Sequence, residues 1–136
     1  MATLLAHTSD VVIQAEGYSL KELFSNGLRQ MNEILLPEYC EAPRHSDCHM
    51  RIRIHDSDPT ALLIDFLSEA LALTYIHQAI FCHVYFDVLT QNDVGGNLYG
   101  RWYPKLETEV KAATCHEAAL RREADGKWTT PVLFDL

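Results

Sequence analysis

The sequence lacks the motifs by which small enzymes are usually identified. No Ser-His-Asp order, nucleophile elbow, phosphate-binding loop or dinucleotide-binding fingerprint occurs along its 136 residues. Each of these motifs places a reactive or phosphate-binding group at a fixed point of a fold, so their absence leaves catalysis by the chain itself with little support. We therefore expect a protein that is not itself an enzyme.

Basic residues are also few. The chain has 11 Lys and Arg against 19 Asp and Glu, a formal net charge of -8, and only Arg121 and Arg122 are adjacent. Nucleic-acid binders usually carry a clustered basic face, because their affinity depends largely on phosphate neutralisation. We expect no direct, stable nucleic-acid binding. A cation, or a protein partner with a basic surface, fits this charge better.

Targeting and cross-linking signals are missing as well. The first residues carry no positive segment followed by an apolar run, and Asp65, Ser68 and Glu69 interrupt the longest apolar stretch. These features predict a cytoplasmic protein without a membrane span. No CxxC pair occurs, so we expect reduced thiols at all four cysteines, Cys40, Cys48, Cys82 and Cys115.

Two helices are predicted from local signals. Ser19 to Glu22 forms a capping box, and an apolar stripe at helical spacing follows until Pro37. The pair Asp58-Pro59 supplies an N-cap and a proline at the first position of a second helix. Its buried side is predicted to consist of Leu62, Leu63, Phe66, Leu67, Ala70 and Leu71.

The remainder of the chain reads as β-structure. Alternating or β-rich runs predict strands at residues 11–16, 50–54, 81–89, 98–102, 109–115, 119–122 and 127–134. Gly95-Gly96 predicts a turn within residues 92–97, and Asp125-Gly126 predicts a hairpin connection. The predicted fold class is α+β, with one domain over residues 1–136 and two helices packed on a mostly antiparallel β-sheet system.

The two ends of the chain carry the main chemical signal. Asp10 precedes the first strand, and Asp135 lies beside Leu136, which has main-chain or terminal oxygens. Such hard oxygen ligands favour Ca²⁺, Mg²⁺ or Mn²⁺ over zinc, so Asp10, Asp135 and Leu136 are candidate ligands of a divalent metal ion. The alternative for Asp10 is a solvated turn or cap residue. One sequence does not show whether the two ends meet.

A second cluster of candidate ligands lies in ten residues, Cys40, His45, Cys48 and His49. Its spacing matches no zinc-finger pattern, and adjacent residues that open a strand point to opposite faces. We interpret these four as incidental loop residues rather than a zinc site.

Several segments together are similar to a known family. They are His7-Thr8-Ser9-Asp10, Ser19 to Phe24, Leu63 to Leu73, Glu109 to Ala112, Thr114-Cys115-His116, Gly126-Lys127-Trp128 and Val132 to Leu136. In this combination they resemble the archease family over nearly the whole chain. Three positions depart from the family pattern, namely Ala6, Ser9 and Cys115.

The resemblance implies an accessory protein that activates the GTP-dependent RNA-splicing ligase of the RtcB type. It would promote guanylylation and repeated turnover of that ligase in tRNA splicing or RNA repair. The resemblance also implies a metal site at Asp10, Asp135 and Leu136, and it makes His7, Lys111 and His116 candidates for functional or partner contact. A stand-alone metal-dependent phosphoesterase and a chaperone-like interaction module remain as alternatives.

Overall fold

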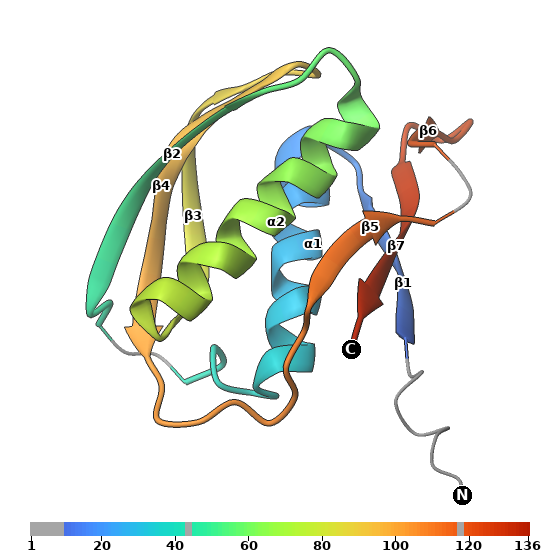
Figure 1. Ribbon diagram of the computed structural model, residues 1–136. Helices are drawn as coiled ribbons and strands as arrows, with labels where there is room; N and C mark the ends of the chain where they lie inside the picture. The colour runs from blue at the N-terminus through green and yellow to red at the C-terminus, as the bar shows by residue number, and fades with distance from the viewer. Residues whose placement is uncertain (1–9, 43–44, 117–118) are drawn as a thin grey trace, which may run out of the picture.

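Two helices lie between two antiparallel sheets and form the middle of three layers (Figure 1). The structure is a computed structural model that describes residues 10–42, 45–116 and 119–136. Both sheets contact the helices, so a single buried apolar cluster fills the space between the layers. In chain order the elements are β1 (Asp10–Gly17), α1 (Leu20–Leu35), β2 (Cys48–His55), α2 (Pro59–His77), β3 (Ala79–Leu89), β4 (Asp93–Trp102), β5 (Ala112–Cys115), β6 (Arg121–Arg122) and β7 (Trp128–Asp135).

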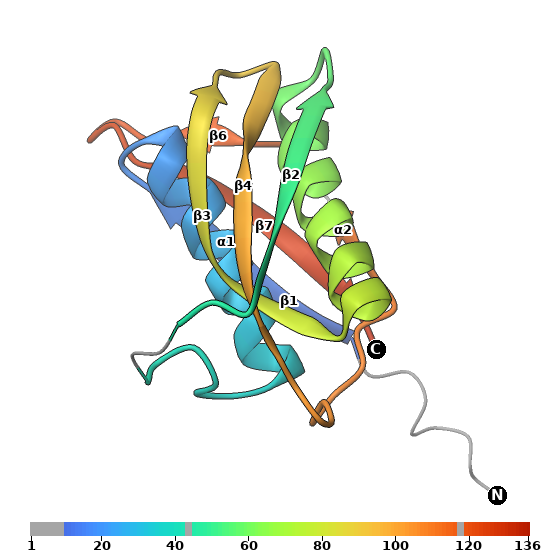
Figure 2. The same ribbon diagram turned by 90° about the vertical axis from the view of Figure 1, so that its left-hand side faces the viewer.

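The two sheets differ in how far apart in the chain their strands lie. One sheet has the order β2-β4-β3 and is built from neighbouring segments; Figure 2 shows it in front of the helices. The other has the order β1-β7-β5, with β6 also paired to β7, so the first and last strands of the described chain are neighbours. Every pairing is antiparallel. The predicted α+β class is confirmed.

Helix α1 begins and ends where its local signals place it. Ser19 is the N-cap, and its Oγ accepts a hydrogen bond of 3.1 Å from the Glu22 N–H. The Glu22 carboxylate in turn accepts the Tyr18 N–H at 2.9 Å, so two N–H groups without helical partners are satisfied. The helix ends at Leu35, two residues before Pro37, which cannot continue it.

Helix α2 is the more apolar of the two helices and lies against both sheets. Asp58 caps it, and Pro59 is its first residue. It has 19 residues and contains an 18-residue window with a mean hydropathy of 1.3, so it is long and apolar enough to cross a membrane by length and composition alone. Eight of its residues are buried between the sheets, as in a core helix. We therefore attribute its composition to packing.

The predicted turn at Gly95-Gly96 is wrong. Both glycines lie inside β4, and the chain reverses earlier, at Thr90 to Asn92. Gly96 faces Phe86 of β3, where an added Cβ would clash with the carbonyl oxygen of Tyr85. Close approach of the two backbones therefore explains this glycine, whereas the sequence alone suggested a turn.

The expectation of four reduced thiols is also wrong. Cys40 and Cys82 form a disulfide that links the segment after α1 to β3, with 5.4 Å between the Cα atoms. The partners lie 42 residues apart, so no local spacing could reveal the pair. The disulfide uses one of the four candidate zinc ligands, and among the rest His49 lies beside the Tyr99 ring, in keeping with incidental residues.

Two glycines make a matched test of packing. Gly96→Ala should lower the free energy of unfolding by about 2 kcal/mol or more, because the new methyl group meets backbone atoms that cannot move aside. Gly27→Ala should instead raise it by about 0.5 to 1 kcal/mol, since its Cβ would lie 3.6 Å from Leu67 in ordinary contact and alanine favours a helix. Urea denaturation of both variants measures the difference; equal effects would contradict this packing.

The disulfide should stabilise the fold mainly by restricting the unfolded chain. For a closed loop of this length the chain-entropy relation gives about 4 kcal/mol. We expect reduction of the wild-type protein to lower its free energy of unfolding by about 2 to 4 kcal/mol in guanidinium denaturation, without changing native packing. Cys82→Ala should remove this dependence on reductant, and Cys115→Ser, outside the disulfide, should retain it. If reductant leaves the free energy of unfolding of the wild-type protein unchanged, the result would contradict the cross-link.

Candidate functional site

Asp10 and Asp135 lie directly opposite each other on adjacent strands. The register of β1 and β7 pairs Asp10 with Asp135 and, one step further, Val11 with Phe134. Phe134 is fully buried against the helices, whereas both aspartates are exposed. Because side chains alternate along a strand, the two carboxylates project together from the outer face of the sheet. Asp10 and Asp135 thus meet, as the metal-site hypothesis requires.

The backbone of Asp135 is held from both sides. Its second neighbour is Ala112 of β5, and the Lys111 N–H donates a hydrogen bond of 2.7 Å to the Asp135 carbonyl oxygen. Before β5, the Tyr75 hydroxyl of α2 accepts the Val110 N–H at 2.9 Å and donates to the Val110 carbonyl at 2.8 Å. Burial of the hydroxyl raises the pKa of Tyr75, so it stays a neutral donor near neutral pH. This contact fixes the segment that supports Asp135.

The remaining candidates are placed differently. Lys111 adjoins Asp135 through its main chain and lines a cavity of about 270 Å³ between α2 and β5. Leu136 directly follows Asp135 in the chain, and its partly buried side chain packs against the core. His116 follows Cys115, whose partner is Val132. At about 3.3 Å per residue, Val132 lies about 10 Å from Asp135 along β7. His116 is one residue beyond Cys115, so it is not at the pair. His7 lies outside the described residues.

The pair fits a hard cation only in part. Like charges directly opposite each other across two strands are destabilising, and a cation between them would remove that repulsion. Two carboxylates and a main-chain oxygen are oxygen ligands of the kind that Ca²⁺ and Mg²⁺ take, with water completing the shell. Across residues 10–42, 45–116 and 119–136, however, no three His, Cys, Asp or Glu side chains form a group that could hold an ion. Any ion here would keep several waters.

Sequence reasoning identified the two aspartates and Lys111 but missed the contact between Tyr75 and Val110. This contact joins a helix to a loop 35 residues later in the chain. The local sequence gives no indication that a tyrosine of α2 supports the candidate site.

Comparisons with known proteins agree with the fold. The model of the Archease protein family matches residues 3–136. "Protein archease" of Methanosarcina acetivorans is 26% identical, covering 97% of this chain and 93% of that protein. "Protein archease" of Pyrococcus furiosus is 29% identical, covering 96% of this chain and 94% of that protein.

Two solved structures share the fold. Protein 1598 of Methanobacterium thermoautotrophicum aligns with a TM-score of 0.68 at 23% identity, over 95% of this chain and 94% of its own. A Thermotoga maritima archease, described as a possible chaperone, aligns with a TM-score of 0.67 at 17% identity, over 100% and 98%. Since the family model covers nearly the full length, this chain belongs to the archease family.

Proposed function

We propose that this protein activates a GTP-dependent RNA-splicing ligase of the RtcB type, promoting its guanylylation and its repeated turnover. The observation that carries the proposal is the direct opposition of Asp10 and Asp135 on the exposed face of one sheet. Membership of the archease family and the net charge of -8 support it. An acidic protein is better suited to approach the metal and nucleotide centre of another protein than to bind RNA directly, because RNA is itself negatively charged.

The position of the pair suits insertion into a partner's active site. Asp10 is the first residue of β1 and Asp135 the last of β7, so both lie at the same end of the sheet, close to the C-terminus in both views (Figures 1 and 2). There the two carboxylates and the Leu136 main-chain oxygen would hold a divalent cation, Ca²⁺, Mg²⁺ or Mn²⁺. A bound cation would supply charge neutralisation for phosphate groups. The Lys111 N–H would hold the main chain of Asp135 in place while the partner is engaged, and the Tyr75 hydroxyl would hold the neighbouring Val110.

A chaperone-like role is the second candidate. The Thermotoga maritima relative is described as a possible chaperone. In this chain Ile76 and Trp102 are 69% and 59% exposed. Exposed apolar side chains can bind unfolded clients. This role would not depend on the two aspartates, which separates it from ligase activation.

Metal binding at the pair makes a first prediction. In EDTA, Asp10→Asn should melt at or slightly above the wild-type temperature, because it removes the repulsion between opposed carboxylates. In Mg²⁺, Mn²⁺ or Ca²⁺ the wild type should gain stability, by about 2.7 kcal/mol at 100 times the dissociation constant, and the variant should gain little. Differential scanning calorimetry with and without each ion measures this.

Glu16→Gln is the matched control, since Glu16 is an exposed carboxylate on the same strand and faces Thr129 rather than a second acid. It should respond to metal as the wild type does. Equal stabilisation of Asp10→Asn and the wild type by every ion would exclude a metal site at this pair.

Ligase activation makes a second prediction. With a cognate RtcB-type ligase, GTP and limiting Mn²⁺, the wild-type protein should increase ligase guanylylation. Asp10→Asn and Asp135→Asn should reduce that gain at least 10-fold, because the charge that holds the cation is halved, whereas Glu16→Gln should retain it. Gel analysis of the labelled ligase–GMP adduct measures the rate.

The outcomes of this assay separate the candidate functions. Full activation by both aspartate variants would overturn the proposal. Aggregation suppression that Asp10→Asn leaves unchanged, without any ligase activation, would favour a chaperone. Phosphoester hydrolysis by this protein alone, lost in Asp10→Asn, would favour a metal-dependent phosphoesterase.

A further inference from the structure

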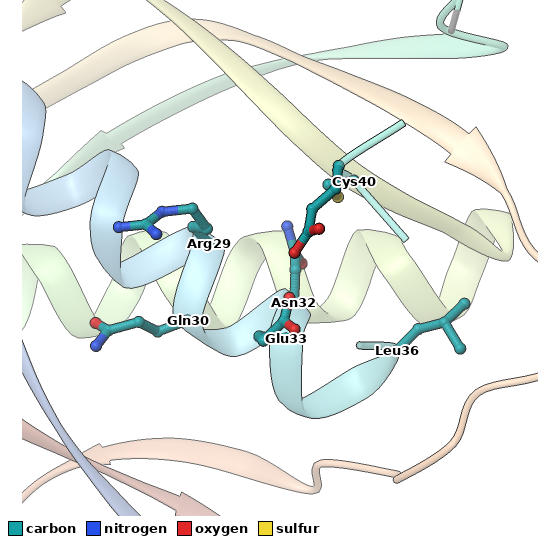
Figure 3. Close-up of a pocket in the computed structure, with 7 residues that line it drawn as sticks. Arg29, Gln30, Asn32, Glu33, Leu36 and Cys40 are labelled. Carbon is teal, nitrogen blue, oxygen red and sulfur yellow. The ribbon is translucent and has the colours of Figure 1, made fainter. Parts of the chain in front are cut away.

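A second candidate site lies far from the aspartate pair in the chain and shares no residue with it. It is a cavity of about 270 Å³ between the C-terminal half of α1 and the segment that follows this helix (Figure 3). Its lining consists of Arg29, Gln30, Asn32, Glu33, Leu36, Cys40 and Glu41. The disulfide from Cys40 to Cys82 ties this wall to β3, so the cavity is bounded by a helix and a cross-linked segment.

Asn32 brings a buried hydrogen-bond acceptor to this cavity. The residue is only 4% exposed, and its side chain projects from α1 toward Cys40 (Figure 3). Its Nδ2 donates a hydrogen bond of 3.0 Å to the Phe81 carbonyl oxygen, which fixes the orientation of the amide. Among the described residues its Oδ1 has no hydrogen-bond donor. A buried acceptor without a donor is unfavourable, so this oxygen is suited to an external donor.

The charge around Asn32 is negative. Segment 30–42 contains three glutamates and no Lys or Arg, and two of the three, Glu33 and Glu41, line the cavity. Both carboxylate oxygens of Glu33 accept the Glu38 N–H, at 3.1 and 3.2 Å, which holds this side chain in place.

The cation that lines the cavity points elsewhere. The Arg29 guanidinium projects away from Asn32 and Cys40 (Figure 3), and its Nη2 donates to the Asn26 side chain at 2.9 Å. The Gln30 amide also projects away from Asn32 and Cys40 (Figure 3), and its Nε2 donates to the Gln14 carbonyl oxygen at 3.4 Å, so the acceptor beside Cys40 is that of Asn32. The lining therefore offers acceptors and negative charge, together with the apolar side chain of Leu36.

We propose that this cavity binds a small organic ammonium ion, such as a short alkyl amine or diamine. An ammonium group carries three donors and one positive charge, which match Asn32 Oδ1 and the carboxylates of Glu33 and Glu41. Leu36 and the disulfide would contact its alkyl chain. The cavity is slightly smaller than a typical ligand pocket, which favours a small ligand. An inorganic cation is a poorer match, because it would leave the apolar side chain of Leu36 and the disulfide without a contact.

The test uses the full-length protein and 1,4-diaminobutane in low-salt buffer. Isothermal titration calorimetry should show saturable binding with a dissociation constant of about 1 mM or below. Amide shifts in NMR spectra should be confined to the C-terminal half of α1, the following segment and the strand around Phe81. The neutral analogue 1,4-butanediol should bind at least 10-fold more weakly, because it lacks the charge that Glu33 and Glu41 recognise.

Matched variants locate the site. Glu41→Gln should weaken 1,4-diaminobutane binding at least 5-fold, while Glu38→Gln, in the same segment but outside the lining, should leave it within about 2-fold of wild type. Asn32→Leu should also weaken binding. Because this substitution removes the hydrogen bond to the Phe81 carbonyl oxygen, circular dichroism checks that the variant folds. If Asn32→Leu does not fold, Glu41→Gln alone locates the site.

Absence of saturable binding, or equal binding by Glu41→Gln and Glu38→Gln, would overturn the proposal. Equal binding of the diamine and the diol would overturn the assignment to an ammonium ion. Ligase activation by Asp10 variants is measured separately, so either proposal can fail without the other.

Discussion

The insertion of β7 between β1 and β5 is the constraint on which the rest of the structure depends. Both edges of β7 are hydrogen-bonded, so the strand has a fixed register on each side. Its alternate residues Val132 and Phe134 turn inward and are fully buried against the helices. The same register places Asp135 beside Asp10. One set of backbone hydrogen bonds thus builds part of the core and brings two like charges together on the outer face.

Features with a local cause were predictable from the sequence. Ser19 and Asp58 are N-caps as expected, because capping depends on a few adjacent residues. The order of helices and strands follows from hydrophobic periodicity, which is also local. The resemblance of both chain ends to one family suggested that Asp10 and Asp135 belong to a common site. The register that pairs them is a long-range property, and only the structure supplies it.

Features that depend on distant contacts were missed. The Gly95-Gly96 pair has the composition of a turn, but it lies inside β4, where β3 approaches too closely for a side chain at Gly96. Cys40 finds Cys82 across 42 residues. Asn32 did leave a signal, since it lies one turn after Leu28 on the buried stripe of α1, where a polar residue needs a partner. That partner, the Phe81 carbonyl, is again remote in sequence.

The place of β7 in its sheet also affects how the nascent chain folds. On the ribosome β1 emerges first, and β7 emerges after every other described strand. The β2-β4-β3 sheet and both helices come from neighbouring segments and can assemble early, whereas β1 and β5 must wait for their shared partner. During that interval two strand edges lack a partner and one side of the helical layer is uncovered, a state prone to association with other chains. The emergence of β7 is therefore the step that completes the β1-β7-β5 sheet.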